Sequence, residues 1–148
     1  MADDKELSLY RELNASGYEA SVIATFNVRF SLYERVLLRR LLAAGCRYNL
    51  LLADAAQCGT SLSMGEDVPE LAGSEYALVP IQAQGAFHPK FVLLLGRTKA
   101  RLIVGSHNVS VGGFGLNREI ATAFDIDPSG ASADLAKEVW QFARAWAS

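Results

Sequence analysis

The side chains best suited to chemistry lie in one stretch of the chain, between His88 and Glu119. His88 and Lys90 form a His-x-Lys pair, and Ser106 and Asn108 follow in a Gly-Ser-x-Asn sequence. Cleavage of a phosphodiester without a metal needs a nucleophile, a cation for the non-bridging oxygens and neutral donors that fix the phosphate. An imidazole, an ammonium, a hydroxyl and an amide meet these needs. The pattern therefore predicts a site that holds a phosphate and can attack phosphorus.

The sequence between the two pairs predicts how they are brought together. Phe87–Leu95 and Arg101–Gly105 are apolar runs typical of β-strands, and the short charged stretch between them is typical of a hairpin turn. The His-x-Lys pair lies at the start of the first strand, and the Gly-Ser-x-Asn sequence lies at the end of the second. The pair and the Gly-Ser-x-Asn sequence thus lie at opposite ends of a predicted hairpin, an arrangement that can hold a phosphate.

This arrangement resembles the HKD motif of the phospholipase D superfamily. In that motif His-x-Lys is followed by an Asp, then by Gly-Ser-x-Asn and, about a dozen residues later, by an acid. His88 and Lys90 match the first part, Ser106 and Asn108 match the turn, and Glu119 falls where the acid is expected. The resemblance implies an α/β fold for the whole chain, a phospholipase D-like sandwich with a mixed central β-sheet flanked by helices.

Two features depart from the motif. Leu95 occupies the position of the Asp, and Gly105 follows Lys90 by 15 residues, where the motif has 12. The Asp of the family is understood as a mainly structural residue near the hairpin turn. Its loss together with a longer connection predicts a rebuilt hairpin and an intact site.

The mechanism that the resemblance implies is a two-step displacement. One histidine attacks phosphorus to form a phosphohistidine, a second protonates the leaving oxygen, and water then completes hydrolysis. Here His88 would be the nucleophile, Lys90 a point charge on the phosphate oxygens and Asn108 a neutral donor. Glu119 would accept from one nitrogen of the His88 ring and so fix its tautomer, as the acid does in a catalytic triad.

Three further residues are assigned to the substrate phosphate, namely Ser106, Arg118 and His107. Each assignment has a structural alternative. Ser106 could only shape the turn, His107 could point away from its neighbours, and Arg118 could form a surface ion pair with Glu119. His88 itself could simply begin a strand.

The mechanism needs two histidines, whereas the chain has one copy of the motif and His107 as its only other histidine. The resemblance implies two solutions. A homodimer would place two copies of the motif across a two-fold axis. Alternatively, residues 1–148 are the N-terminal part of a longer protein with a second phospholipase D-like half.

Composition bounds the class of protein. With 148 residues, 51% of them hydrophobic and 20% charged, the chain can form one core and is expected to be a single domain, residues 1–148. The start MADDKELS lacks the features of a signal peptide, and no apolar run approaches the roughly 18 residues of a membrane span, so a cytoplasmic protein is expected. Cys46 and Cys58 lack metal-site spacing, which predicts reduced, partly buried thiols. No metal or cofactor is expected.

The charge of the chain is unevenly distributed. The net charge of −2 is unlike that of most nucleic-acid-binding domains, but between Lys90 and Arg118 there is no acidic residue. This basic segment would attract an anion. Arg97, Lys99 and Arg101 could instead form no more than a solvated hairpin tip.

The remaining pattern predicts alternating helices and strands. Helices are expected at about Asp4–Ala15, from a Ser31/Glu34 capping box to Gly45, and at Ser132–Ala147 with Leu135, Val139, Phe142 and Trp146 facing inward. Strands are expected at Ala20–Phe30, Tyr48–Ala53, Glu75–Ile81 and Ile120–Ile126, besides those of the hairpin. Residues 54–73 are predicted to be a loop with one short helix.

These observations favour a metal-independent phosphodiesterase, and specifically a homodimeric nuclease that acts on DNA or RNA. Two alternatives remain open at this point. One is a hydrolase or transferase of the same superfamily that acts on lipids or small phosphodiesters. The other is a non-catalytic domain in which the motif serves phosphate binding or dimerisation.

Overall fold

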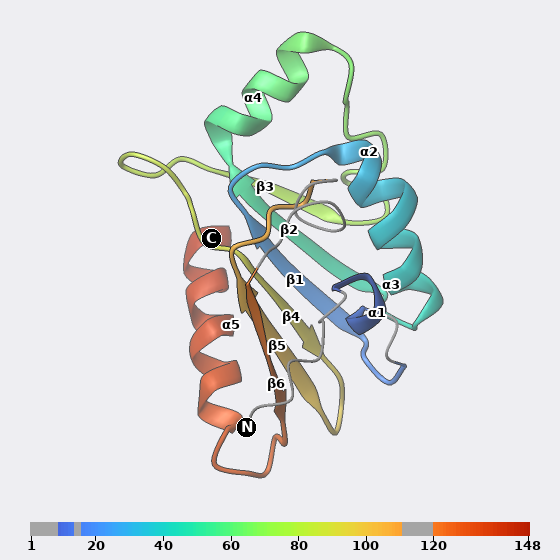
Figure 1. Ribbon diagram of the computed structural model, residues 1–148, viewed down its shortest axis with the longest axis vertical. Coiled ribbons are helices and arrows are strands. Elements are labelled where there is room, and N and C mark those ends of the chain that lie inside the picture. Colours follow the sequence, from blue (N-terminus) through green and yellow to red (C-terminus); the bar gives the residue numbers. More distant parts are fainter. Residues whose placement is uncertain (1–8, 14–15, 111–119) are drawn as a thin grey trace.

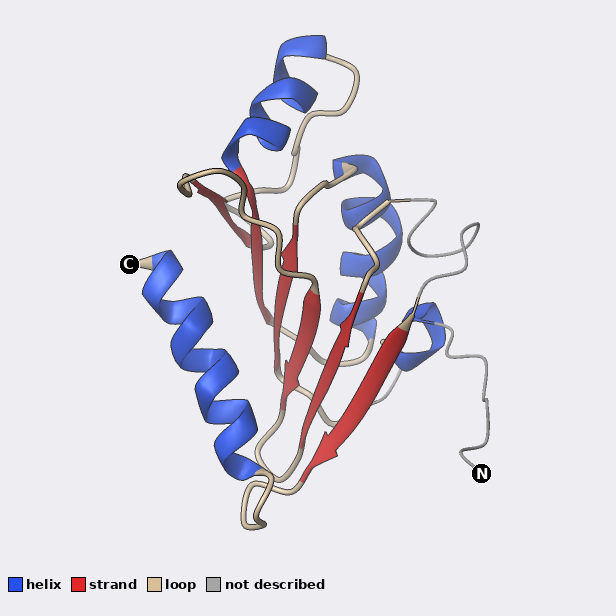
Figure 2. Ribbon diagram, turned by 60° about the vertical axis from the view of Figure 1, so that its left-hand side comes forward, coloured by secondary structure: helices blue, strands red, loops and turns tan. Residues whose placement is uncertain are grey.

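The structure is a computed structural model that describes residues 9–13, 16–110 and 120–148. It is a three-layer sandwich, with a β-sheet between helix α5 (Ala133–Ala147) and a helical segment on the opposite face. Figure 2 shows the three layers. This helical segment, residues 30–43, consists of α2 (Phe30–Leu32), the π-helical η1 (Tyr33–Leu38) and α3 (Arg39–Ala43), and α1 (Leu9–Glu12) lies near its end. Helix α4 (Ala55–Met64) extends from one end of the sheet (Figure 1).

The sheet has six strands in the order β3-β2-β1-β4-β5-β6. Strands β1, β2 and β3 are parallel to one another, and β4, β5 and β6 join them through antiparallel pairs. The mixed sheet flanked by helices is therefore confirmed. The strands are β1 (Ala20–Thr25), β2 (Tyr48–Asp54), β3 (Ala77–Ile81), β4 (Phe91–Leu95), β5 (Ala100–Gly105) and β6 (Ala121–Ile126).

Successive side chains of a strand point to opposite faces of the sheet, so the hydrophobic core is divided into one cluster on each face. In β1, Ile23 packs with the helical segment, whereas Val22 and Ala24 belong to the cluster beneath α5. In β2, Leu51 and Leu52 are divided in the same way. Each central strand buries both of its faces, which explains why β1 and β2 read as continuous apolar runs.

The helical segment begins differently from the prediction. The Ser31/Glu34 capping box is wrong, because no side chain of the helix caps its first turn. The carboxylate of Asp67 does so instead, accepting from the backbone N–H of Phe30 at 2.6 Å and of Ser31 at 2.7 Å. A cap supplied from 36 residues away leaves no local pattern in the sequence.

Glu34 connects the helical segment to residues 70–76 through hydrogen bonds of its side chain. Its side chain is 5% exposed and faces the core, where its carboxylate accepts from the backbone N–H of Leu71 at 2.9 Å and from the Tyr76 hydroxyl at 3.0 Å. It also accepts from the N–H of Glu70 at 3.2 Å. Glu34 and Asp67 together tie segment 65–76 to the helical segment.

Three further boundaries differ from expectation. Strand β1 ends at Thr25 and not at Phe30, and β4 begins at Phe91 and not at Phe87. In residues 54–73, α4 is a full ten-residue helix whose N-cap is Asp54. The predicted first helix is described only as α1, since residues 1–8 and 14–15 lie outside the described part.

Helix α5 confirms the predicted closing helix, but its apolar face is only partly covered. Leu135 and Val139 pack on the cluster beneath it, whereas Phe142 and Trp146 are 40% and 38% exposed. The predicted inward orientation is therefore only partial for these two aromatic rings. Among the described residues, no helix has both the length and the apolar character needed to cross a membrane.

The two cysteines are buried free thiols, as expected from their spacing. Burial raises the pKa of each thiol to about 11. The carboxylate of Asp54 contributes to the higher pKa of Cys58. Thiols with such pKa values are protonated and unreactive at neutral pH.

Candidate active site

The β4–β5 hairpin brings the two halves of the motif together. Phe91 pairs with Val104, and the N–H of Gly105 donates to the carbonyl of Lys90 at 3.3 Å. The predicted hairpin is confirmed, and its antiparallel pairing places both halves at its open end. Thr25 lies at the same end, because Ala24 of β1 pairs with Phe91. We call this end of the sheet the site end, and the end that carries the 96–99 turn the tip end.

His88 and Lys90 contact each other directly. The Nζ atom of Lys90 lies 2.9 Å from Nδ1 of His88 and donates to the His88 carbonyl at 3.2 Å. The imidazole is exposed and the lysine half-buried. An imidazole ring and a cation therefore occupy one small, solvent-accessible region.

The backbone next to His88 is held from three sides. The N–H of Phe87 donates to Asp54 Oδ2 at 2.8 Å, and the Phe87 ring is buried with its centroid 5.6 Å from that of Trp146 on α5. Pro89 fixes its own φ and disfavours a helical conformation at His88. His88 is thus presented on a constrained extended segment just before β4.

Phe26 forms an aromatic contact with His88. The two ring centroids are 4.7 Å apart with an interplanar angle of 39°, and the Lys90 Nζ atom lies 5.9 Å from the centroid of the Phe26 ring. Tilted ring pairs at this separation are favourable. Phe26 therefore restricts the orientation of the imidazole from the β1 side.

Asn108 is anchored to the end of β1. Its Oδ1 atom accepts from the N–H of Asn27 at 3.1 Å and lies 3.4 Å from Thr25 Oγ1. The Thr25 hydroxyl, which is fully buried, donates to the Asn27 carbonyl at 2.6 Å and accepts from the N–H of Val109 at 3.1 Å. Because the amide oxygen of Asn108 faces these donors, the part of its side chain suited to a phosphate is the Nδ2 donor.

Ser106 and His107 are placed differently from each other. Ser106 is exposed, and its Oγ atom accepts from the N–H of Ile120 at 3.1 Å. His107 is only 3% exposed, which does not favour a contact with substrate. A Cβ atom at Gly105 would lie 2.4 Å from the Ile120 carbonyl and 2.8 Å from His107 Nδ1, so this motif position admits no side chain.

The remaining two predicted site residues, Arg118 and Glu119, lie outside the described residues. Their roles stay predictions from the motif. The structure thus gathers His88, Lys90 and Asn108 in one region, with the exposed Ser106 on the same turn and the His107 side chain buried.

The cations of the hairpin turn lie at the tip end, where they contact local partners. Arg97 Nε donates to Glu19 at 2.8 Å, and Lys99 Nζ donates to the Ser16 carbonyl at 2.6 Å. Arg101 forms ion pairs with both Glu12 and Asp125. These three cations belong to the hairpin tip and not to the site, as the structural alternative held.

Leu95 also lies at the tip end. It ends β4 and pairs with Ala100, and its carbonyl accepts from the N–H of Glu19 at 2.7 Å. Leu95 follows Lys90 by five positions along extended chain, a distance of about 16 Å. The residue that replaces the motif Asp therefore completes a regular hairpin and does not contact the site.

Sequence reasoning missed four residues that position the site, namely Thr25, Phe26, Asn27 and Asp54. A signal was present, because each lies at or just after the carboxyl end of β1 or β2. In α/β sheets, ligands bind at the carboxyl ends of parallel strands. Polar residues that follow such apolar runs were therefore candidates.

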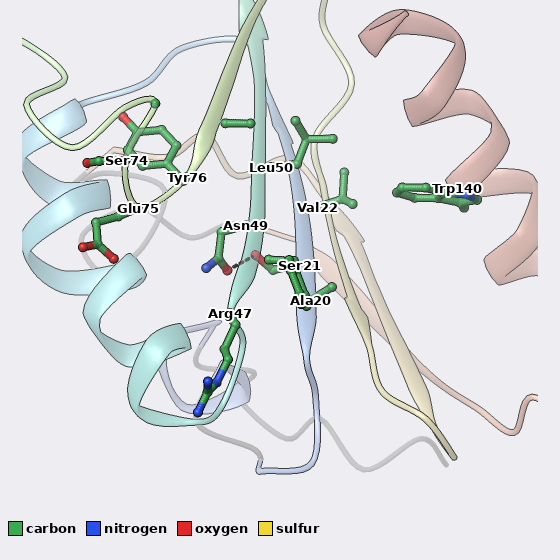
Figure 3. Close-up of a pocket in the computed structure, with 13 residues that line it drawn as sticks. Ala20, Ser21, Val22, Arg47, Asn49, Leu50, Ser74, Glu75, Tyr76 and Trp140 are labelled. Carbon is green, nitrogen blue, oxygen red and sulfur yellow. Dashed lines mark hydrogen bonds between the residues drawn. The ribbon is translucent and has the colours of Figure 1, made fainter.

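A hollow of about 410 Å³ lies elsewhere, at the tip end of β1 and β2. Figure 3 shows Trp140 facing β1 across it and the hydrogen bond between Ser21 and Asn49. Its lining consists of residues at the start of β1 and β2, residues 73–77 and Trp140, so it is separate from the candidate site.

Comparison of the sequence with known proteins gives no match, either to a family model or to a curated protein. Solved structures do match. Nuc from Salmonella typhimurium, a phospholipase D family member, has a TM-score of 0.64 at 15% identity, and the match covers 93% of this chain and 82% of Nuc. NucT from Helicobacter pylori has a TM-score of 0.59 at 14% identity, with coverage of 93% and 84%.

A longer protein shares the same architecture. A mutant of the yeast tyrosyl-DNA phosphodiesterase has a TM-score of 0.58 at 11% identity, and the match covers 82% of this chain. The chain spans only 28% of the length of that phosphodiesterase. Together these likenesses show that the chain has a phospholipase D-like fold, as the motif predicted.

Proposed function

Because the chain has a phospholipase D-like fold, we propose that it is a metal-independent phosphodiesterase that hydrolyses DNA or RNA. The reaction proceeds through a phosphohistidine at a site shared by two copies of the chain. The observation that carries the proposal is the proximity of His88, Lys90 and Asn108, which come from two sides of one hairpin and lie against the end of β1.

Each of these residues has a distinct role in the first step. An imidazole nitrogen of His88 attacks phosphorus, and the bond from phosphorus to the leaving oxygen breaks. Lys90 neutralises charge on the non-bridging oxygens, and the Asn108 amide donates to one of them. Phe26 and the anchored Phe87 backbone keep the imidazole in place, which lowers the entropic cost of attack.

The second histidine comes from the partner copy. Its protonated ring gives a proton to the leaving oxygen and then, as a neutral base, takes a proton from the water that attacks the phosphohistidine. The bond from phosphorus to His88 breaks and the free imidazole returns. A two-fold axis that brings the two site ends together satisfies this requirement with one motif per chain.

The test is hydrolysis of bis(p-nitrophenyl) phosphate and of labelled single-stranded and double-stranded DNA and RNA in excess EDTA. The native chain is expected to cleave at least one of these substrates, and His88→Ala is expected to lose at least ~10³-fold in rate, since the nucleophile is removed. A folded native chain that cleaves none of them would overturn the proposal, and so would His88→Ala with native activity.

The shared site is tested by mixing subunits. Native chain mixed with excess His88→Ala, after demonstrated subunit exchange, is expected to lose more activity than dilution explains, because mixed dimers lack one histidine. Activity that simply follows the fraction of native chain would exclude a site that draws on both copies.

A further inference from the structure

The segment that leads away from the site end carries an unusual excess of arginine. Between Glu19 and Asp54 the sequence contains a single acidic residue, Glu34. Its buried carboxylate accepts hydrogen bonds from segment 65–76. The same stretch contains five arginines: Arg29, Arg35, Arg39, Arg40 and Arg47. This part of an otherwise acidic chain is therefore strongly positive.

Four of these arginines are exposed, namely Arg29, Arg35, Arg39 and Arg47. We call the three that begin or belong to the helical segment, Arg29, Arg35 and Arg39, the arginine surface. Within residues 9–13, 16–110 and 120–148, none of the four side chains forms an ion pair or hydrogen bond. Arg40 differs, because it is half-buried with its guanidinium 3.6 Å from the centre of the Tyr10 ring. Four uncompensated guanidinium groups would attract a polyanion.

The arginine surface begins beside the candidate site. Arg29 follows Asn27 by two residues, Asn27 contacts Asn108, and the N–H of Arg29 itself donates to the Val109 carbonyl at 2.8 Å. From there the helical segment 30–43 runs along one face of the sheet away from the site end (Figure 1). Arg39 lies ten residues further on, at the start of α3.

Arg35 and Arg39 are four residues apart, so their side chains are neighbours on the helix surface. They lie about one helical turn apart, a spacing suited to contacts with successive phosphates of one phosphodiester strand. Segment 65–76, which packs beside this helix, carries the exposed Glu66, Glu70 and Glu75. These carboxylates mark the limit of the positive region on the side of segment 65–76.

We propose that the arginine surface binds the phosphate backbone of the nucleic acid beyond the scissile phosphate. The inference rests on the proposed function, because it takes the substrate to be a nucleic acid strand that enters at His88. Guanidinium groups suit this task, since their paired N–H donors match phosphate oxygens. Backbone contacts of this kind position a strand without reading its sequence.

The test measures binding of a labelled 20-nucleotide DNA, single-stranded and duplex, in a His88→Ala background that prevents cleavage. Arg35→Ala/Arg39→Ala is expected to bind at least about tenfold more weakly at low salt, with a slope of log affinity against log salt that is shallower by roughly 1.4 to 1.8, because two phosphate contacts are lost. Arg144→Ala is the matched control, because Arg144 is an exposed arginine on α5, across the sheet. It is expected to bind as the parent does.

Hydrolysis of bis(p-nitrophenyl) phosphate separates this inference from the proposed function. With His88 present, Arg35→Ala/Arg39→Ala is expected to cleave this small diester at the native rate, since the substrate does not extend to the helix. Arginine-dependent DNA binding by a chain that cleaves nothing would support the arginine surface and overturn the proposed function.

Three outcomes would overturn the arginine surface. One is native DNA binding by the double variant while the native chain still cleaves the small diester. Another is an equal loss of binding in Arg144→Ala. The third is arginine-dependent binding to phosphatidylserine and phosphatidylcholine vesicles with no binding to DNA, which would assign the surface to a membrane.

Discussion

The two ends of the β4–β5 hairpin carry similar basic residues but use them differently. At the tip end, Arg97 and Arg101 form ion pairs with acids from other segments, and Lys99 donates to a backbone carbonyl. At the site end, Lys90 contacts the ring of His88, and Asn108 is held by the end of β1. The difference teaches that a basic stretch of sequence becomes a candidate site only where the fold brings a nucleophile and neutral donors to it.

The largest difference between the two ends is expected when one lysine is removed from each. Lys90→Ala is expected to lower the rate of bis(p-nitrophenyl) phosphate hydrolysis at least ~10²-fold, because charge on the phosphate oxygens is no longer neutralised in the transition state. Lys99→Ala, the matched control, is expected to keep the native rate. Equal rates for the two variants would show that the ends do not differ in chemistry.

A smaller effect is expected from the buried hydroxyl that holds Asn108. Thr25→Val keeps the shape of the side chain but removes its bonds to Asn27 and Val109, so the Asn108 amide would lose its fixed orientation. We expect kcat to fall about 10-fold to 100-fold with a much smaller change in KM, and Thr25→Ser to restore most of it.

Ser21→Ala is the matched control for Thr25→Val. Ser21 is a buried hydroxyl at the other end of β1 that donates to Asn49 Oδ1 at 2.7 Å. Its loss is expected to cost about 1–3 kcal/mol of stability, similar to the loss at Thr25, because in each case a buried polar group is left without its partner. Only the Thr25 variant should lose activity. A similar loss of kcat in both variants would mean that the lower stability, and not the position of the Asn108 amide, causes the loss.

The smallest expected effect concerns the two buried thiols, one near each end of the sheet. Cys46 precedes β2 at the tip end, and Cys58 lies on α4 at the site end. Burial raises the pKa of both to about 11 from an ordinary 9.0, so the folded state favours the neutral thiol. The contribution of the neutral thiols to the free energy of unfolding is fully present below pH 9. It is lost as pH rises from about 9 through about 11.

At pH 10 the free energy of unfolding, measured with urea, should be lower than at pH 8 by roughly 1 kcal/mol per thiol. Cys46→Ala/Cys58→Ala should show a correspondingly smaller decline over the same pH range. Both native thiols are expected to react slowly with a disulfide reagent at pH 8. Fast reaction at Cys58 together with slow reaction at Cys46 would show that the site end opens more readily than the tip end.

The sequence predicted the hairpin and the proximity of the motif halves because both depend on local alternation. Strands β4 and β5 follow from apolar runs, and an antiparallel pair leaves few choices for where Lys90 and Gly105 lie. The phospholipase D-like fold followed from the same residues. Predictions succeeded where a neighbouring residue determines the structure.

Predictions failed where a distant residue determines the structure. The helical segment begins at Phe30 because Asp67 caps it, and β1 ends at Thr25 where the chain turns to pair with residues 108 and 109. The capping box was wrong because Glu34 was drawn into the core by segment 65–76. No local pattern contains these partners, and the only sequence signal for the residues that anchor Asn108 is that they lie at or just after the end of an apolar run.

Segment 65–76 has a consequence for engineering. Surface connections are usually the places where insertions and fused domains are tolerated. This one ties itself to the helical segment through Asp67 and Glu34, and that segment follows directly from the Asn27 turn that holds Asn108. Lengthening the connection would disturb the helix start and, through it, a site residue elsewhere in the chain. For grafting or permutation it is therefore part of the scaffold, although it lies at the surface.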